Sequence, residues 1–408
     1  MKSIFPKVIM VCTRDIPEKS QNGREKTLDF IFKSLSRRGA VSFYRLTSVF
    51  EDRSLNRLIR LIFAFVNGLL RGASLPMQSL LFYDVSQYRR LVELVLLEKP
   101  QSVYFDGVRS GIMAIALRKR FPDLHMVCDF DDLMSRRMRM LAILKKPIAL
   151  GYLERYVPLW LKKYFLDGLM GRMIRAYEIR ALINAEKAIL AVVNSAVLVS
   201  SVDAQEIYKM GLSGVEVIPP YIQRLREFSG ADPVRRFIFI GSDALLQNKL
   251  TIDFLISLWG RVNPALELHI YGKQTKSYLD VSGVVFHGFV NSLDDIYSPG
   301  SILIAPSFIG GGVKTKVLEA MSYGAIVLGT DVTFEGIDAP TEGLVVGYKD
   351  WEKVVCNPAD FSKSWNEAGE RVVLAVAKSH SEEYLSSRWC DVVWPCSYKN
   401  QQNVQCGG

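Results

Sequence analysis

The sequence predicts an α/β protein with two domains, each built around a parallel β-sheet. Its 408 residues suffice for two domains of ordinary size, and the 49% hydrophobic content allows large cores. A strand–helix alternation starts with the apolar run Lys7–Cys12. It restarts at Arg236–Ser242, after the polar segment 223–233. Between Ser301 and Thr330 a strand, a Gly-rich loop, a helix and another strand follow in turn, which indicates a βαβ crossover.

The N-terminal half is expected to begin as a Rossmann-like domain. Its strands are predicted at 7–12, 40–46, 101–107, 124–130 and 196–201. Helices are predicted at 27–39, 110–120 and from Ala176 onward, with Gly39 as the C-cap of the first. The loop before the first helix lacks the G-x-G-x-x-G pattern, so a dinucleotide is not implied.

The C-terminal half repeats this organisation. Strands are predicted at 236–242, 266–272, 284–290, 301–305 and 325–330, and helices at about 250–261, after the glycines, and at 381–393. The fourth strand leads into Gly310, Gly311 and Gly312, and Lys314 and Lys316 follow in the first turn of the next helix.

The two lysines point to an anionic ligand. A helix N-terminus is positive, so cations there are disfavoured unless an anion is bound. Glycines allow a close approach of the backbone to a phosphate or diphosphate. Glu319, one to two turns further, is placed to hold sugar hydroxyls. The alternatives are a solvated helix face beside a plain turn, or a Walker-type loop, which fails because Val313 stands where Gly must precede Lys.

The segment GGGVKTKVLEAMSYGAIVLGTDVTFEGID resembles the nucleotide-sugar-binding segment of retaining group 1 glycosyltransferases, which have the GT-B fold. The resemblance implies two Rossmann-like domains facing a central cleft, with a C-terminal helix crossing back to the N-domain. It places an N-terminal acceptor-side domain at 1–222, a nucleotide-sugar-binding domain at 235–375, the crossing helix at 376–393 and a polar tail at 394–408.

The resemblance also implies roles for single residues. Glu319 matches the Glu that binds the donor ribose. Many members carry another Glu eight positions earlier, but here that position is Gly311, as in the branch with Gly-x-Lys-x-Lys in its loop. The resemblance therefore assigns no residue to the hydroxyls of the transferred sugar. Lys314 is expected to be catalytic, and the expected donor contacts are Gly310, Gly311, Gly312, Lys314, Thr315, Lys316, Glu319, Lys249, Phe289 and Gly23.

Three carboxylates, Asp129, Asp131 and Asp132, lie at the carboxyl end of the strand 124–130, where α/β sheets place ligands. In related transferases this turn lies near the reacting sugar, so by resemblance Asp131 and Asp132 match catalytic positions. An N-cap role for Asp132 is the alternative. No His or Cys spacing predicts a metal site, and the six scattered cysteines favour reduced thiols in the cytoplasm. No signal peptide is evident in the sequence, and no apolar run reaches the length of a membrane span.

Positive charge is concentrated between Arg136 and Arg180. Eleven basic residues stand there against three acidic ones, an excess nearly as large as the net charge of +9. Aromatic residues, among them Trp160, are interleaved, which suits an anionic membrane surface. RNA binding and a solvated face are the alternatives, but no RNA-binding signature is present, so no nucleic acid is expected. The apolar segment Leu55–Arg71 fits a buried helix or an interfacial one.

These features predict a glycosyltransferase that moves a sugar from a nucleotide diphospho-sugar to a glycan or lipid-linked glycan, in surface polysaccharide synthesis. The resemblance implies retention of anomeric configuration, and no metal or cofactor. The enzyme is expected in the cytoplasm, peripherally on the inner face of the cell membrane. The alternatives are a sugar-nucleotide epimerase, which shares the GT-B fold, and a non-catalytic scaffold that binds nucleotide sugars.

Overall fold

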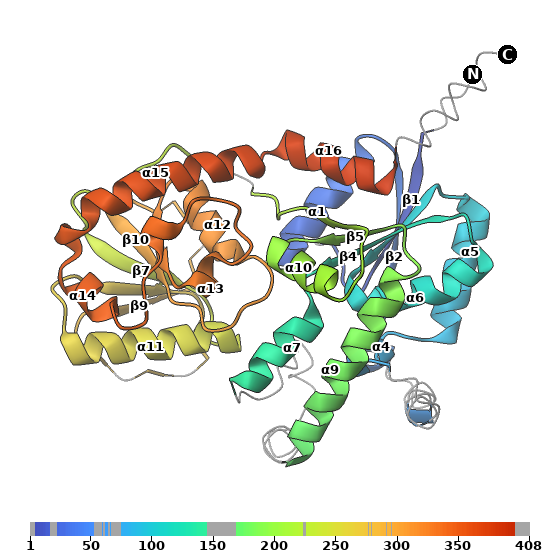
Figure 1. The fold of residues 1–408 in the computed structure, drawn as a ribbon, viewed down its shortest axis with the longest axis horizontal. Coiled ribbons are helices and arrows are strands. Elements are labelled where there is room, and N and C mark those ends of the chain that lie inside the picture. The colour runs from blue at the N-terminus through green and yellow to red at the C-terminus, as the bar shows by residue number, and fades with distance from the viewer. Residues whose placement is uncertain are drawn as a thin grey trace. The chain divides into compact units, whose positions relative to one another are not determined.

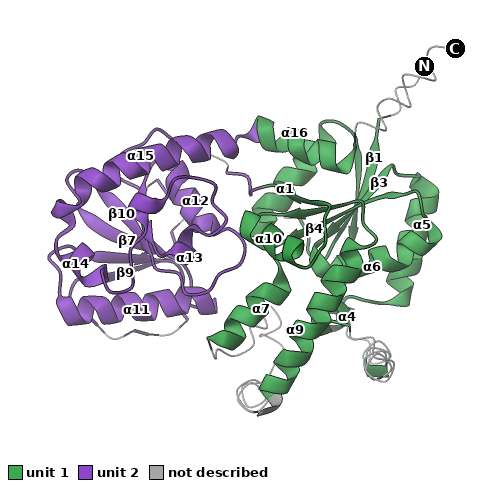
Figure 2. Ribbon diagram, viewed as in Figure 1, with its two compact units in different colours: residues 1–148, 155–218, 383–408 green, residues 149–154, 219–382 purple. Residues whose placement is uncertain are grey.

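The structure is a computed structural model that describes residues 5–16, 23–52, 59, 62, 63, 66, 75–144, 169–222, 226–275, 277, 278, 280–290, 292–294 and 296–395. Two compact units emerge (Figures 1 and 2). Unit 1 holds the described residues up to Ile218 and again from Glu383. Of the described residues, unit 2 holds those in Pro219–Glu382.

Unit 1 is built on a six-stranded sheet in the order β2-β1-β3-β4-β5-β6, in which every pair is parallel. Its strands are β1 (Lys7–Cys12), β2 (Ala40–Arg45), β3 (Ser102–Asp106), β4 (His125–Asp131), β5 (Ser195–Leu198) and β6 (Val215–Val217). Its helices are α1 (Gly23–Ser36), α2 (Val49–Asp52), α4 (Met77–Leu80), α5 (Val85–Glu98), α6 (Gly107–Arg120), α7 (Met134–Ile143), α9 (Leu169–Leu190), α10 (Ser201–Lys209) and α16 (Glu382–Val393).

Unit 2 contains a five-stranded parallel sheet in the order β11-β10-β7-β8-β9. Its strands are β7 (Arg236–Ile240), β8 (Leu268–Tyr271), β9 (Val284–Gly288), β10 (Ser301–Ala305) and β11 (Ile326–Gly329). Its helices are α11 (Leu246–Val262), α12 (Thr315–Ser322), α13 (Asp331–Phe334), α14 (Trp351–Cys356) and α15 (Ser362–Ser379), with short 3₁₀ turns at Glu342–Leu344 and Pro358–Asp360.

The central strands are mostly apolar because helices cover both faces of a parallel sheet. All five residues of β3 and all five of β10 are buried. The amphipathic helices complete the cores: α1 buries Leu28, Ile31 and Leu35, and α12 buries Val317, Leu318 and Met321. The α/β fold with two parallel sheets, predicted from the strand–helix alternation, is confirmed.

Helix α1 begins four residues before the predicted start. The polar segment up to Lys26 reads as loop, but Gly23 already opens the helix. The Thr27 hydroxyl donates to the Gly23 carbonyl at 3.1 Å, and Glu25 lies in the first turn, where the helix dipole favours an acidic residue. This early start brings Arg24 onto the helix, which matters for the site below.

The chain leaves unit 1 after Ile218 and returns to it at Glu383. Helices α15 and α16 are separated by His380 and Ser381, and Nδ1 of His380 lies 2.7 Å from the Pro220 carbonyl oxygen. Trp389 of α16 packs edge-on against Tyr104 of β3, with 6.0 Å between ring centroids. The Val392 carbonyl lies 2.9 Å from Nε2 of His125 at the start of β4. The last helix is therefore part of the unit 1 core.

In both sheets the strand order identifies the edge at which ligands are expected to bind. In a parallel sheet ligands bind beyond the carboxyl ends of the strands, where the strand order reverses. In unit 1 the order reverses on either side of β1, and in unit 2 on either side of β7. Loops that follow β1, β3 and β4, and those that follow β7 and β10, are therefore where functional residues are expected.

Among the described residues no helix is long and apolar enough to cross a membrane. Four residues of the apolar segment Leu55–Arg71 are described, and all four are helical. Ile59, Ile62, Phe63 and Val66 are 45–69% exposed, and their spacing puts them on one helix face. For these residues the expectation of a buried helix is wrong, and an exposed apolar face remains.

Candidate functional site

The glycine loop of unit 2 connects β10 to α12, at the carboxyl edge of the sheet. Gly310, Gly311 and Gly312 are buried. Gly311 has φ 105° and Gly312 has φ 61°, conformations that side-chain-bearing residues rarely adopt. Lys314 is the N-cap residue of α12 rather than part of its first turn, and it is 8% exposed. The backbone around the glycines thus turns sharply into a helix start that carries a buried cation.

Lys316 extends from the first turn of α12 to the neighbouring strand β7. Its Nζ donates to Oδ1 of Asn248 at 2.7 Å and lies 3.5 Å from the Ile240 carbonyl. The ammonium also sits 4.3 Å from the centre of the Phe239 ring. Burial, and then the charge of Lys314, lowers the pKa of Lys316 to about 7. No carboxylate in the described part of the chain pairs with this ammonium, so it is ready to bind an anion.

Opposite charges hold the two backbone polar groups of Gly311. The Gly311 amide donates to Oε2 of Glu335 at 3.1 Å, and Nζ of Lys314 donates to the Gly311 carbonyl at 3.2 Å. Glu335 comes from the turn after α13, 24 residues further along the chain. A carboxylate therefore contacts the amide of Gly311, and a cation contacts its carbonyl.

Thr333 ties the Glu335 turn to the end of β10. Its hydroxyl donates to the Ala305 carbonyl at 2.6 Å and accepts from the Ser307 amide at 3.2 Å. The Thr330 hydroxyl donates to the Ser307 carbonyl at 2.8 Å. A Cβ at Gly329 would stand 2.4 Å from Thr333 atoms, so this close packing requires glycine. Glu335 is thus fixed relative to the glycine loop before any ligand binds.

The other expected donor residues of unit 2 are more scattered. Lys249 is exposed, and its neighbour Asn248 contacts Lys316 instead. Thr315, the first residue of α12, is exposed. Phe289 is 77% exposed beyond the end of β9 and so is available for stacking. Glu319 is half-buried, and its charge adds to burial in raising the pKa of the Tyr297 hydroxyl well above its usual range.

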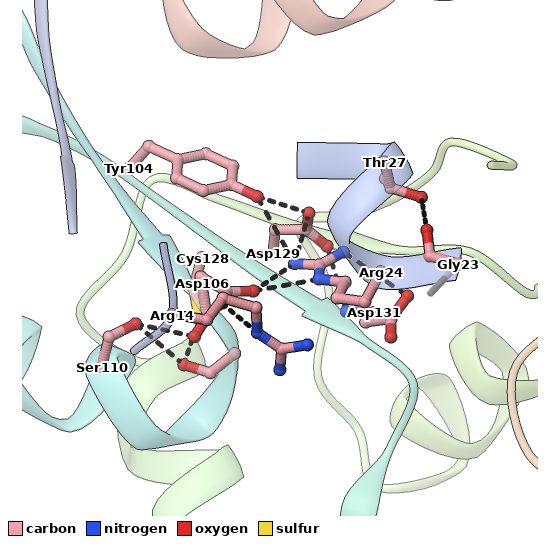
Figure 3. A network of polar contacts seen from close by, with 11 residues as sticks. Arg14, Gly23, Arg24, Thr27, Tyr104, Asp106, Ser110, Cys128, Asp129 and Asp131 are labelled. Carbon is pink, nitrogen blue, oxygen red and sulfur yellow. Dashed lines mark hydrogen bonds and ion pairs between the residues drawn. The ribbon is translucent and has the colours of Figure 1, made fainter. Parts of the chain in front are cut away.

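In unit 1 a buried arginine gathers the carboxylates at the ends of β3 and β4 (Figure 3). Nη2 of Arg24 lies 2.6 Å from Oδ1 of Asp106 and 2.9 Å from Oδ2 of Asp129. Its Nη1 lies 3.4 Å from Oδ1 of Asp131. The Tyr104 hydroxyl donates to Asp129 at 2.6 Å. We call Arg24, Tyr104, Asp106, Asp129 and Asp131 the Arg24 cluster.

The charges of the Arg24 cluster do not balance. Burial would raise the pKa of Asp106, but the charges of Arg24 and Arg14 outweigh it and lower that pKa. Burial raises the pKa of Asp129, and Arg24 offsets only part of the effect. Three carboxyl groups thus share one buried guanidinium, with Arg14 3.5 Å from Asp106 at the edge. The cluster holds an excess of acidic groups at the ligand-binding edge of the sheet.

Asp131 is the exposed member of the cluster. Its backbone has φ 62°, in the left-handed region, where β4 changes register against β5. The Asp131 amide donates to Oδ1 of Asp129 at 3.0 Å, and its side chain is 38% exposed. A left-handed non-Gly residue costs about 1 kcal/mol or more and persists where its surroundings impose it. The cluster therefore presents one carboxylate to solvent in a fixed orientation.

Asp132 lies apart from this arrangement. It is buried and pairs with Arg137 of α7. The N-cap alternative for Asp132 is wrong, because α7 begins at Met134 with Leu133 in the cap position. Gly23 opens α1 beside Arg24. In the described part of the chain no three His, Cys, Asp or Glu side chains form a group that could hold a metal ion.

The structure adds Arg24, Asp106, Asn248 and Glu335 to the candidate residues. Asp106 lies at the end of β3, and Asp129 and Asp131 lie at the end of the neighbouring strand β4. Two adjacent strands that end in carboxylates could have identified Asp106 from the sequence. Arg24 directly follows Gly23, which was an expected donor contact. Whether the Arg24 side chain extends to the end of the sheet depends on where α1 lies. Glu335 belongs to the TDVTFEGID stretch that carries the resemblance, but its contact with the Gly311 amide spans 24 residues and had no local signal.

Residues 234–357 match the family described as "Glycosyl transferases group 1". This segment contains the glycine loop, both lysines, Asn248 and Glu335. No curated protein matches the sequence at a significant level. The match supports the group 1 glycosyltransferase family for the matched part of unit 2.

Solved structures resemble the whole chain at low identity. HepE of Anabaena in complex with UDP is 10% identical, with a TM-score of 0.59, over 94% of this chain and 98% of that one. Sucrose-phosphate synthase from Thermosynechococcus elongatus is 13% identical, with a TM-score of 0.60, over 98% and 100%. The lipopolysaccharide outer core galactosyltransferase WaaB is 11% identical, with a TM-score of 0.59, over 95% and 99%. These likenesses show that the chain has the GT-B fold.

The Arg24 cluster should be the main electrostatic contribution to the stability of unit 1. Replacing Arg24 by Met leaves buried carboxylates without their cation, and we expect a loss of about 3–5 kcal/mol in the free energy of unfolding at pH 7. The pKa of Asp106 is lower in the folded protein than in the unfolded chain. The stabilisation is therefore complete when the pH is above the ordinary pKa of an Asp, and it is lost as the pH falls through the lowered pKa. The loss should therefore shrink toward pH 3. Denaturant unfolding at both pH values measures it.

Lys33 on the same helix provides the control. Its ion pair with Asp29 is 63% exposed on the lysine side, so Lys33→Met should change the stability by about 0.5 kcal/mol or less. Equal unfolding midpoints for Arg24→Met and Lys33→Met would show that the Arg24 cluster has no such role.

Proposed function

We propose that this protein transfers a sugar from a nucleotide diphospho-sugar to a glycan or lipid-linked glycan acceptor. The observation that carries the proposal is the pair Lys314 and Lys316, held at the start of α12 beside three buried glycines. The family match over residues 234–357 includes this loop. HepE was solved with UDP and with UDP-glucose, which makes a UDP-sugar the first donor to test.

The mechanism rests on electrostatic stabilisation of the leaving group. Negative charge develops on the diphosphate as the glycosidic bond to the donor breaks. Lys314, Lys316 and the free amides at the N-terminus of α12 would stabilise that charge, and Glu319 would bind the ribose hydroxyls. In this proposal the reaction retains the anomeric configuration, and the lysines act in place of a metal ion or cofactor. The exposed carboxylate of Asp131 is the acceptor-side group, because it lies at the ligand-binding edge of unit 1.

The lysine role is tested by mutation of Lys314. Removing a preorganised charge that acts on the leaving group costs roughly 100-fold or more in turnover. We therefore expect Lys314→Ala to lower kcat/KM by at least about 100-fold in an assay of nucleotide release from the donor. Lys363→Ala, an exposed lysine of α15, should leave kcat/KM unchanged.

Product analysis separates the two other functions that this fold suggests. An epimerase would convert the donor without any acceptor, which NMR of the products detects. A scaffold would bind the nucleotide sugar without converting it.

Unchanged turnover in Lys314→Ala would show that Lys314 has no role in the mechanism.

The depressed pKa of Lys316 predicts that donor binding takes up a proton. Near its pKa of about 7 this ammonium is partly deprotonated in the free protein, and a bound diphosphate favours the charged form. Affinity should therefore fall as the pH rises, by about tenfold between pH 6.5 and 8.5. Calorimetry at pH 8 in buffers of different ionisation enthalpy would detect the uptake. A diphospho-sugar is the suitable probe, because its phosphates do not titrate in this range.

Lys316→Met is the control for this measurement. The variant should bind the donor more weakly at pH 6.5, and its binding should take up no proton at pH 8. Proton uptake that persists in Lys316→Met would assign the titration to another group.

We further propose that the protein binds peripherally to the cytoplasmic leaflet, where a lipid-linked acceptor would lie. Of the eleven basic residues between Arg136 and Arg180, those at 145, 146, 155, 162 and 163 fall outside the described residues, as does the aromatic cluster around position 160. Arg136, Arg137 and Arg139 pair with Asp203, Asp132 and Glu206. Arg172 and Arg180 of α9 are exposed.

The exposed apolar face formed by Ile59, Ile62, Phe63 and Val66 is the strongest structural support for membrane binding. Apolar side chains on one face of a helix enter the interface, while basic residues are attracted to anionic lipid. Because salt screens this attraction over about 8 Å at physiological ionic strength, binding should weaken at high salt.

Vesicle co-sedimentation tests this proposal. The protein should sediment with vesicles that contain anionic lipid at low salt, and much less at high salt or with neutral vesicles. Ile62→Ser with Phe63→Ser should reduce binding several-fold by removing buried apolar area. Leu97→Ser, which changes an 81% exposed leucine of α5, should not. Equal recovery in the supernatant for anionic and neutral vesicles at low salt would contradict membrane binding.

A further inference from the structure

We propose that Glu335 binds the hydroxyl groups of the transferred sugar and thereby selects neutral sugars as donors. This inference rests on the proposed function and assigns the part of the donor that no residue yet accounts for. The donor-sugar contact is missing at Gly311, where the resemblance places a Glu that this chain lacks. The structure brings a carboxylate to that same residue from another part of the chain, since Oε2 of Glu335 accepts from the Gly311 amide at 3.1 Å.

The position of Glu335 relative to the lysines separates two kinds of ligand group. Lys314 and Lys316 suit the diphosphate, which is anionic. A carboxylate repels phosphate but accepts hydrogen bonds from hydroxyl groups. Glu335 contacts the amide of Gly311 and Lys314 contacts its carbonyl, so the change from phosphate-binding to hydroxyl-binding groups occurs across this residue. A diphospho-sugar has these groups in the same order along its length.

The carboxylate is preorganised for this task. Thr330 and Thr333 tie the segment before Glu335 to Ala305 and Ser307 at the end of β10. Gly336, with φ 80°, allows the chain to turn away directly after Glu335. Glu335 is half-buried, so its side chain is reachable while part of its hydration has already been removed. A charged acceptor fixed in this way loses little freedom when a sugar binds.

A purely structural role for Glu335 predicts a different outcome. If the carboxylate only braces the glycine loop, its loss would weaken the binding of the diphosphate and of the whole donor alike. Glu335→Gln separates the two roles, because the amide oxygen still accepts from the Gly311 amide while the charge is removed. Glu335→Ala removes both functions. Glu342→Gln is the matched control, an exposed glutamate of the same segment.

The experiment measures the dissociation constants of UDP, GDP and ADP, and of the glucose derivative of the tightest binder, by calorimetry. We expect Glu335→Gln to bind the nucleoside diphosphate within about twofold of the wild type. The same variant should bind the diphospho-glucose about 10- to 100-fold more weakly, the loss expected for hydrogen bonds to a charged group. Glu342→Gln should match the wild type for both ligands. Thermal unfolding of each variant checks that it is folded.

The matching diphospho-glucuronate provides a second readout. The wild type should bind it at least tenfold more weakly than the diphospho-glucose, because its carboxylate meets Glu335. This preference should largely disappear in Glu335→Gln.

The outcomes distinguish this inference from the proposed function. If Glu335→Gln changes the affinity for diphosphate and diphospho-glucose by one common factor, or changes neither, the inference is wrong and the proposed function stands. If the wild type binds none of the three nucleoside diphosphates, the proposed function fails and the inference fails with it.

Discussion

The structure of unit 2 is organised around the positive charge of Lys314 and Lys316 at the start of α12. Lys316 is half-buried against Phe239 and Asn248, beside the buried Lys314, at the end of a helix whose dipole already disfavours cations. Evolution of a stable fold alone would not favour this arrangement, because two such cations weaken the free protein. It becomes favourable when an anion is present. The glycines and the bonded turn after β11 then have a common purpose, which is to let that anion approach closely.

Unit 1 shows the opposite charge at the equivalent edge of its own sheet. There a single guanidinium holds three carboxyl groups, and one of them, Asp131, is presented in a strained backbone conformation. Each sheet reverses its strand order beside its first strand, β1 or β7, and each cluster gathers at the carboxyl ends near that point. Both units thus gather charged residues at the same place in a parallel sheet, but the two clusters differ in charge. A basic edge suits phosphate, and an acidic edge suits hydroxyl groups.

Local sequence was sufficient to predict every strand except β6, and also the glycine loop with its two lysines, because each depends on residues that are adjacent in the chain. Lys314 was expected in the first turn of α12, but it is the N-cap residue. The start of α1 was misjudged because polar residues such as Arg24 and Lys26 read as loop, although a helix that packs on a sheet can begin with them. The contacts of Glu335 with Gly311 and of Asn248 with Lys316 could not be predicted, since each depends on how a turn is folded back by tertiary packing. Asp132 and Asp131 are neighbours in sequence, yet a change of register in β4 separates their roles.

The return of the chain to unit 1 has a consequence for biosynthesis. Trp389 and Trp394 are nearly fully buried, and Trp394 packs so closely on Gly39 that a Cβ there would meet the indole at 2.7 Å. A ribosome that has made Ile218 must still synthesise all of unit 2 before these residues emerge, roughly 10–30 s at ordinary elongation rates. During that interval the nascent first unit exposes the apolar surface that α16 will cover. The described part of unit 2 is one continuous stretch and can complete its own core without waiting, so chaperones would be needed chiefly by the part of the protein that is made first.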